Sequence, residues 1–326
     1  MKITIVGPGI MPIPPIGWGA VEILIHDLSC ELKAAGHEVT IVNVPAKDEI
    51  IKAVNESTPD FVHIQYDDHV DIVPHILCDK VAVTSHCPYL ESPQKWDENY
   101  RKIVSQFLTS GADVFALSPE IAGVYSRAVI QNSGNPSLKL SLEKIHVVHN
   151  GVRTDLFKFD ETAEYPERSI CLAKIEPRKR QRFLQDIPNL YYAGNVHDEQ
   201  FSSSLHLGEW TKEHLYENLT KYANLVLLSD GEAHPLVCME ALSAGLGLVL
   251  SEFACGNLDP AHPFIDVIPE KFVKNKGYVE RIIRENAEKS VKMRKQIREY
   301  SEEFSWKNVV RTKYIPAVNK ILSRVD

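Results

Sequence analysis

Residues 224–245 read NLVLLSDGEAHPLVCMEALSAG. The apolar run 224–229 has no alternation and ends in turn residues, which is typical of a strand buried in a parallel sheet. A helix is expected to start near Pro235, because proline has a fixed φ and no N–H and suits a first helical position. Gly245 is its expected C-terminal stop. This strand–turn–helix unit predicts an α/β fold.

Two glutamates in this stretch have a spacing that suits a ligand. Glu232 is expected in the turn above the strand end, and Glu240 about one and a half turns along the helix. Two such carboxylates can serve separate hydroxyl clusters, while the helix N-terminus between them suits an anion. A nucleotide-sugar has that layout of ribose, diphosphate and hexose. The pair also has a purely structural explanation, since acidic residues are common near helix starts.

Length, charge and cysteine usage limit the class of protein. The chain has 326 residues, which is typical of two domains, and its net charge of −8 argues against nucleic-acid binding. The six cysteines lie far apart, with no zinc-type spacing, so we expect reduced thiols and no metal. No stretch reads as a signal peptide or a transmembrane helix. We expect a cytoplasmic protein, and the sequence leaves a peripheral membrane contact open.

The N-terminal half starts as a βαβ unit, with strands at 2–6 and 38–44 and a helix at 21–35. A dinucleotide-binding fold starts in the same way. However, Gly7-x-Gly9 lacks the third glycine and no acidic residue ends the second strand, so an NAD site is not expected.

Two features of this half are candidates for ligand contact. The loop Gly17-Trp18-Gly19 can bring backbone amides close to a phosphate, although a simple turn explains the same glycines. His86 ends one of the further predicted strands, where ligands of parallel sheets bind, although a histidine at such a position more often has a structural role. The further elements expected in this half are strands at 61–66, 81–86, 113–118 and 145–152 and helices at 49–54 and 99–108.

A polar segment without clear period, 153–168, is the expected domain boundary. The second α/β series that follows has expected strands at 169–173, 190–193, 205–207 and 246–250, a helix at 212–223 and a final helix with a kink at Pro316. Its first strand ends in a run of cations that can neutralise a diphosphate or form a solvated basic face. These cations are Lys174, Arg178, Lys179, Arg180 and Arg182.

Together these residues resemble glycosyltransferase family 4, the retaining nucleotide-sugar glycosyltransferases of GT-B fold, over nearly the whole chain. The resemblance lies in the order and spacing of several short motifs. These are Gly17-Trp18-Gly19-x-x-Glu22, Gly36-His37-Glu38-Val39, Phe61-Val62-His63, Thr84-Ser85-His86, Asn150-Gly151-Val152, Ala173-Lys174-Ile175-x-Pro177-x-Lys179, the pair Glu232 and Glu240, and Phe304-Ser305-Trp306.

The resemblance implies two Rossmann-like, doubly wound parallel-sheet domains that face each other across a cleft. Residues 1–153 would form the acceptor-side domain, onto which the C-terminal helix 305–326 crosses back. Residues 154–304 would form the donor domain.

The resemblance also implies a retaining hexosyltransferase of carbohydrate biosynthesis. It would move a hexose from a nucleoside-diphosphate sugar to a hydroxyl of a glycan, lipid or small molecule, without a metal or other cofactor. The implied catalytic residues are His86, Lys174, Lys179 and Glu232. The implied donor-binding residues are Gly17, Trp18, Gly19, Lys174, Lys179, Glu232, Ala233, His234, Pro235, Leu236, Val237 and Glu240.

Within that set, each charged residue has an implied role. Lys174 and Lys179 would hold the diphosphate and stabilise the charge on the leaving group. Glu240 would bind the ribose and Glu232 the transferred sugar, which His86 would also contact. Backbone around residues 18–19 would close over the phosphates.

The sequence departs from the family pattern at two places in the donor site. Lys174 stands where arginine is usual, which keeps the charge but loses the bidentate fork. Ala233-His234-Pro235 stands where Gly-Phe-Gly is common, so the identity of the sugar is undefined. The alternatives are a GT-B nucleotide-sugar epimerase or hydrolase, and a catalytically inactive sugar-nucleotide binding protein. The adjacent Asp67-Asp68-His69 is expected to be a solvated or acceptor-facing loop rather than a metal site.

Overall fold

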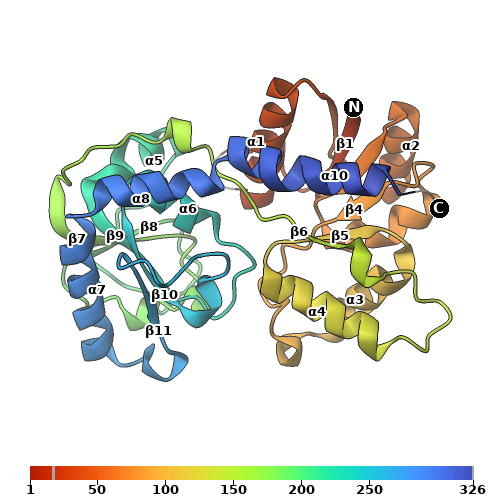
Figure 1. Cartoon of the computed structure of the whole chain (residues 1–326). Coiled ribbons are helices and arrows are strands. Elements are labelled where there is room, and N and C mark those ends of the chain that lie inside the picture. The colour runs from red at the N-terminus through yellow and green to blue at the C-terminus, as the bar shows by residue number, and fades with distance from the viewer. Residues whose placement is uncertain (17–18, 325–326) are drawn as a thin grey trace. The chain divides into compact units, whose positions relative to one another are not determined.

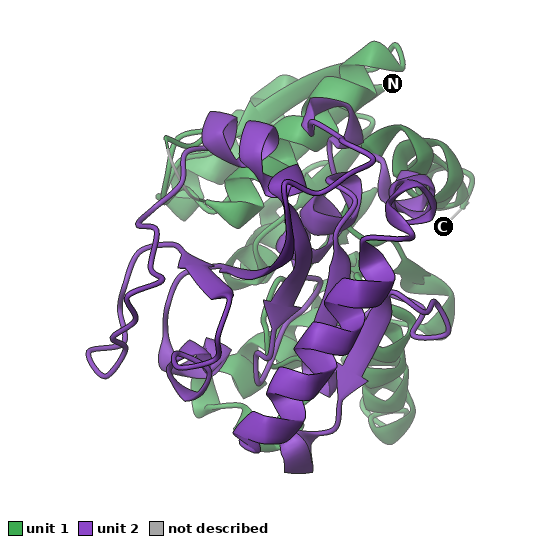
Figure 2. Ribbon diagram, turned by 90° about the vertical axis from the view of Figure 1, so that its left-hand side faces the viewer, with its two compact units in different colours: residues 1–151, 306–326 green, residues 152–305 purple. Residues whose placement is uncertain are grey.

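The computed structural model describes residues 1–16 and 19–324. The chain divides into two compact units, unit 1 with Met1–Gly151 and Trp306–Asp326, and unit 2 with Val152–Ser305 (Figures 1 and 2). Each unit contains a parallel sheet with helices, so the prediction of two Rossmann-like α/β domains is confirmed. Within the described ranges, every helix is too short or too polar to cross a bilayer.

Unit 1 is built on one parallel sheet. Its strands are β1 (Lys2–Val6), β2 (Glu38–Val42), β3 (Phe61–Ile64), β4 (Val81–Val83), β5 (Asp113–Ala116) and β6 (Ile145–Val147). They lie in the order β2-β1-β3-β4-β5-β6, and each neighbouring pair is parallel. Its helices are α1 (Ala20–Ala34), α2 (Lys47–Ser57), α3 (Glu98–Ser110), α4 (Pro119–Gln131), α9 (Trp306–Val309) and α10 (Ile315–Leu322).

The C-terminal helices belong to unit 1 because of close packing at their start. α9 contacts α1, and the ring of Trp306 lies where a Cβ on Gly151 would come within 2.4 Å of it. A π-helical turn, Val310–Tyr314, separates α9 from α10. It lies directly before Pro316, which cannot donate a backbone hydrogen bond, so the irregularity occurs where the sequence predicts a kink.

Unit 2 is built on a second parallel sheet, in the order β11-β10-β9-β7-β8. Its strands are β7 (Tyr165–Leu172), β8 (Leu190–Ala193), β9 (Tyr222–Leu227), β10 (Gly247–Ser251) and β11 (Ile265–Ile268). Its helices are α5 (Lys212–Asn218), α6 (Leu236–Ser243), α7 (Lys276–Ser290) and α8 (Arg294–Ser301).

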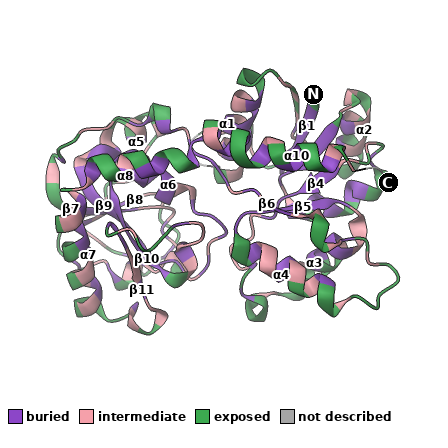
Figure 3. Ribbon diagram, in the orientation of Figure 1, coloured by how far each residue is buried: buried purple, intermediate pink, exposed green. Residues whose placement is uncertain are grey.

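Both faces of this sheet are buried, as the unbroken apolar runs predict (Figure 3). Successive side chains of a strand point to opposite faces. Leu225 and Leu227 of β9 therefore join one hydrophobic cluster with α6, whereas Val226 joins a second cluster with Ile283 of α7.

Buried polar groups fix α7 and α8 to the sheet. Asn224 donates to Asn286 on α7 at 2.9 Å, and Asn286 donates to the carbonyl of Leu248 at 3.1 Å. Arg294 on α8 is 2% exposed and donates to the carbonyls of Asp160, Tyr222, Thr220 and Ala244. Because these acceptors are satisfied inside the unit, the helices are held by directional bonds as well as by apolar packing.

The structure of unit 2 differs from the prediction at three elements. Residues 205–207 form no strand, since only an isolated bridge joins Tyr192 to His206. The helix expected at 212–223 ends as an α-helix at Asn218, because the chain already enters β9 at Tyr222. The strand β11 was not predicted.

Candidate functional site

Two loops of unit 2 bring the predicted donor residues together. The basic loop, residues 174–182, follows β7, and the glutamate loop, residues 228–235, follows β9 and leads into α6. β7 and β9 are neighbours and parallel, so both loops leave the same edge of the sheet. That edge, at the carboxyl ends of the strands, is where open α/β sheets bind ligands.

The centre of the site is the carboxylate of Glu232. Lys179 Nζ lies 3.0 Å from Glu232 Oε1, and Arg178 Nη1 lies 3.2 Å from the same oxygen. The Glu232 side chain is only 11% exposed, so these cations compensate a carboxylate that is largely removed from water. The sequence places Lys179 and Glu232 in one site, and the structure brings these two residues into contact.

Arg178 ties the two loops together. Its guanidinium donates to Ser229 Oγ at 3.2 Å and to the carbonyl of Gly231, and its own carbonyl accepts from the Asp230 amide at 3.0 Å. It also donates to Glu176 Oε1 at 2.7 Å. In the sequence, Arg178 is one of five cations and nothing distinguishes it. Its role depends on the 3₁₀ turn Pro177–Lys179, which places its side chain against the glutamate loop.

Lys174 lies at the start of the same charge cluster. Its ammonium is 3.9 Å from Glu176 Oε2, and Gln181 donates to its backbone carbonyl at 3.0 Å. The cluster therefore contains three cations, Lys174, Arg178 and Lys179, and two carboxylates, Glu176 and Glu232. The excess of one cation gives this group of ion pairs a net positive charge, which favours an anionic ligand such as a phosphate.

Glu240 has a cation of its own rather than a share of this cluster. It is the fifth residue of α6, is 6% exposed, and accepts from Lys212 Nζ at 2.6 Å. Lys212 is the first residue of α5, so this pair joins the starts of two helices. The lysine could not be singled out from sequence, because nothing marks it beside other helix-start lysines.

Both glutamates are held in the same manner. Each accepts from cations through Oε1, whereas Oε2 accepts no hydrogen bond from the residues that the structure describes. A carboxylate oxygen can accept from a sugar hydroxyl. Glu232 and Glu240 are thus oriented by protein cations and each keep an oxygen for a ligand.

The residues between the two glutamates are mostly covered. Ala233, His234 and Pro235 are buried, while Leu236 and Val237 in the first turn of α6 are half-buried. Pro235 has extended backbone (φ −70°, ψ 109°) and is the N-cap, so the helix starts one residue later than a first-position proline implies.

In unit 1, His86 follows β4 and is oriented by a chain of hydrogen bonds. Its Nε2 is 2.9 Å from Gln65 Oε1, and the Gln65 amide nitrogen is 3.4 Å from His63 Nδ1. His63 Nδ1 is also 3.2 Å from the Tyr314 hydroxyl, and His63 Nε2 is 2.8 Å from Thr84 Oγ1. The donors and acceptors match when both histidines carry their proton on Nε2, which leaves Nδ1 of His86 as an acceptor.

Burial keeps these histidines neutral. It lowers the pKa of His63 to about 3, with a smaller contribution from His86, and it lowers the pKa of His86 to about 4. Neutral imidazoles suit a hydrogen-bonding contact with a sugar better than a contact with phosphate charge. His86 belongs to unit 1, so its contact with a donor sugar stays a prediction.

Asp68 is exposed, whereas Asp67 and His69 are buried, so the solvated alternative is wrong for these two residues and the acceptor-facing alternative stays a prediction. Ser85 donates to Asp67 Oδ2 at 2.5 Å, and Tyr100 lies 2.8 Å from Ser85 Oγ. Burial raises the pKa of Asp67, and the bond from Ser85 opposes part of that rise.

The glycine-rich loop is only partly described. Gly17 and Trp18 lie outside the described residues. Gly19 is the N-cap of α1 with φ 149°, and its carbonyl accepts from the Ile23 amide at 2.9 Å. This left-handed backbone favours glycine.

No protein-family model matches the sequence, and no curated protein matches it either. Solved structures do match along the whole chain. Sucrose-phosphate synthase from Thermosynechococcus elongatus aligns with a TM-score of 0.72 and 15% identity, over 98% of this chain and 98% of that one. HepE from Anabaena, in complex with UDP-glucose, aligns with a TM-score of 0.68 and 14% identity over 100% of both chains.

The lipopolysaccharide outer core galactosyltransferase WaaB aligns with a TM-score of 0.65 and 14% identity, over 98% of this chain and 99% of that one. Of these three similar structures, WaaB is a glycosyltransferase by its name. Identities this low establish the fold alone. The chain therefore has the two-domain GT-B fold of nucleotide-sugar glycosyltransferases.

Proposed function

We propose that the chain is a GT-B glycosyltransferase that takes a hexose from a nucleoside-diphosphate sugar, as the resemblance to family 4 implies. The observation that carries this proposal is the contact of Lys179 and Arg178 with Glu232 at the carboxyl edge of the unit 2 sheet. The fold supports it, because a similar structure, HepE, is in complex with UDP-glucose.

The diphosphate of the donor would bind at the basic loop. Lys174 and Lys179 would donate to its oxygens, and the net positive charge of the cluster would stabilise the charge that develops as the sugar–phosphate bond breaks. This electrostatic role requires no metal ion, and the absence of a metal requirement stays a prediction.

The two glutamates would align the donor on either side of the diphosphate. The open Oε2 of Glu232 would accept from a hydroxyl of the hexose, and that of Glu240 from a ribose hydroxyl. Lys212 and Arg178 would keep these carboxylates in place. Holding the donor in one orientation lowers the entropic part of the barrier to transfer.

The reaction would exchange one bond at the anomeric carbon. The bond from that carbon to the diphosphate oxygen breaks, a bond to the acceptor oxygen forms, and the acceptor proton leaves with the nucleoside diphosphate. Family 4 implies retention, with the acceptor a hydroxyl of a glycan, lipid or small molecule. A neutral His86 would contact the transferred sugar.

A donor-panel assay tests this proposal. The protein is incubated with UDP-glucose, UDP-galactose and GDP-mannose, with and without hydroxyl acceptors, and products are identified by mass spectrometry and NMR. We expect a new glycosidic bond when an acceptor is present. The NMR signal of the anomeric proton of the transferred sugar shows whether its configuration is retained. Free sugar or an epimerised nucleotide-sugar would favour the hydrolase or epimerase alternative instead.

Variants separate a transferase from an inactive binding protein. Glu232→Ala is expected to abolish transfer, whereas Glu288→Ala, at an exposed glutamate of α7, is the matched control and should leave it unchanged. Binding of a nucleotide-sugar without any turnover by the unmodified chain would identify the inactive binding protein.

A further inference from the structure

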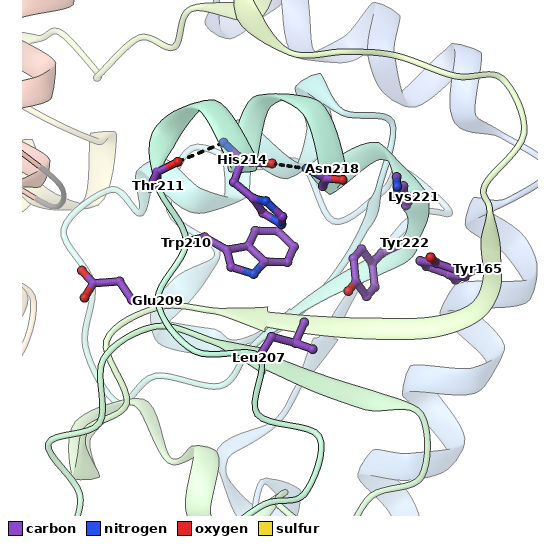
Figure 4. A pocket seen from close by; sticks show the side chains of 9 residues that line it. All are labelled: Tyr165, Leu207, Glu209, Trp210, Thr211, His214, Asn218, Lys221 and Tyr222. Carbon is purple, nitrogen blue, oxygen red and sulfur yellow. Dashed lines mark hydrogen bonds between the residues drawn. The ribbon is translucent and has the colours of Figure 1, made fainter.

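Unit 2 has an aromatic pocket outside the donor residues described above. It has a volume of about 510 Å³ and lies between α5 and the strands β7 and β9 (Figure 4). The rings of Trp210, Tyr222 and Tyr165 line it in a row below α5 (Figure 4). Ring centroids are 6.1 Å apart for Trp210 and Tyr222, and 5.8 Å apart for Tyr222 and Tyr165.

Polar groups border this row of rings. Glu209 lies at one end, and Asn218 and Lys221 lie on the side of α5 (Figure 4). The Asn218 amide nitrogen donates to the carbonyl of His214 at 2.9 Å, and the side-chain oxygen takes no part in that bond. A small pocket with apolar rings and a few polar groups is the usual form of a small-molecule site.

The charges of the pocket argue against an anionic ligand. Lys221, a lining cation, already pairs with Glu164 at 3.2 Å. Arg168, which lies 4.1 Å from the ring centroid of Tyr165, does not line the pocket. The Glu209 carboxylate forms no ion pair within the described part of the chain and would repel a phosphate or an acidic sugar.

The combination fits an uncharged, polyhydroxylated ligand. Aromatic faces carry a negative quadrupole and attract the polarised C–H groups of a pyranose face. Carboxylate and amide oxygens accept from hydroxyl groups. We infer that the aromatic pocket is an accessory binding site for a neutral oligosaccharide.

This site is separate from the proposed donor site and does not depend on turnover. The residue between them is Lys212, which follows Thr211 of the pocket and pairs with Glu240 of the donor site. An accessory site here would hold a glycan on the donor-binding unit. Its existence is tested by binding alone, so failure of the donor assay would leave the result of this test unaffected.

The test is a titration of the full chain with neutral di- to tetrasaccharides of glucose, galactose and mannose, followed by calorimetry and ligand-observed NMR. Saturable binding is expected. Trp210→Ala is expected to weaken it roughly tenfold, which corresponds to the loss of one aromatic stacking contact. Tyr278→Ala is the matched control and should have no effect, because Tyr278 lies on α7, stacks on Phe272 and does not line the pocket.

Two further variants keep the test decisive if Trp210→Ala does not fold. Trp210→Phe keeps an aromatic face and should bind within about threefold of the unmodified chain. Glu209→Gln removes a charge without disturbing the rings and should weaken binding severalfold.

The following results would overturn the inference. They are no saturable binding of any neutral saccharide, equal binding by folded Trp210→Ala or by Glu209→Gln, and displacement of the saccharide by UDP. Displacement by UDP would assign the pocket to the nucleotide instead. Stronger binding of glucuronic acid oligosaccharides than of neutral ones would also contradict it.

Discussion

Replacing Arg178 by alanine tests whether this residue positions Glu232. In the structure its guanidinium donates to Glu232 Oε1 at 3.2 Å, to Ser229 Oγ at 3.2 Å and to the carbonyl of Gly231. The substitution removes all of these bonds at once. Lys179 remains 3.0 Å from Glu232, so the carboxylate keeps one cationic partner.

The expected loss follows from the burial of the pair. Arg178 is 23% exposed and Glu232 is 11% exposed, so solvent screens their interaction only in part. A hydrogen bond to a charged group contributes about 1.5–3 kcal/mol to stability. Because Lys179 compensates part of the loss, Arg178→Ala is expected to lower the free energy of unfolding by about 2 kcal/mol. Arg178→Lys should recover only part of it, since lysine lacks the guanidinium fork.

The assay is urea unfolding of both single variants and the double variant with Glu232→Gln. A coupling energy of about 1–2 kcal/mol between the two positions is expected. Arg281→Ala is the matched control, because its pair with Glu285 lies on an exposed helix face and contributes no more than about 0.5 kcal/mol. Donor turnover should fall in Arg178→Ala, through a lower kcat as well as a higher KM.

Additive effects at Arg178 and Glu232, together with unchanged donor kinetics in Arg178→Ala, would refute this positioning role. In that case the contact is a surface ion pair without consequence for the site. Full recovery by Arg178→Lys would show that only the charge matters.

Three other predictions concern stability. Unfolded histidines bind protons below about pH 6.5, whereas burial lowers the pKa of His63 to about 3 and of His86 to about 4. The free energy of unfolding should therefore fall as the pH decreases from 6.5 toward 4, and it should fall less steeply with pH in His63→Gln. Urea titrations at several pH values check this. The same pH dependence in His63→Gln and in the unmodified chain would contradict it. Arg294→Met leaves several buried carbonyls without a donor and should cost about 3 kcal/mol or more, measured by denaturant unfolding; a cost below about 1 kcal/mol would contradict the buried network. A Cβ on Gly247 would lie 1.8 Å from Ser290 Oγ, so Gly247→Ala should cost about 1–3 kcal/mol and Ser290→Ala should restore part of it; a neutral Gly247→Ala would show that α7 can move away.

Much of the fold was predictable because its strands are short apolar runs that end in turn residues. β9 and β10 were expected within two residues of their observed ends. α4 was not predicted, although Ser118 accepts from the Ile121 amide as an N-cap and Pro119 follows at the first helical position. The apolar residues of α4 also have helical spacing, at Ile121, Val124, Tyr125 and Val129.

Other elements are set by tertiary contacts and carry little sequence signal. β11 includes Asp266, a polar residue in a short strand, and its carboxylate accepts from Asn286 and Lys289 of α7. The segment around His206 lies along β8 without becoming a strand, because it joins β8 through one isolated bridge, followed only by a bond from the Gly194 amide to the carbonyl of Gly208. Such choices depend on neighbours that are distant in sequence.

The candidate site was also predictable only in part. The types and spacing of Lys179, Glu232 and Glu240 were readable from sequence. The pairing of each glutamate with its cations was not, because Arg178 reaches Glu232 through a 3₁₀ turn and Lys212 reaches Glu240 from another helix. Ion-pair partners depend on the exact course of two loops, which spacing alone does not specify.

The central claim is that the basic loop binds the diphosphate of a nucleotide-sugar. Calorimetric titration of UDP and GDP into the unmodified chain, Lys179→Ala and Lys276→Ala tests it most directly. Lys276 is the matched control, since it is an exposed lysine of the same unit that pairs with Asp186 at 3.4 Å. One of the two nucleotides is expected to bind, at least tenfold more weakly to Lys179→Ala and with unchanged affinity to Lys276→Ala. Equal affinity of Lys179→Ala and the unmodified chain, or no binding of either nucleotide, would contradict the account.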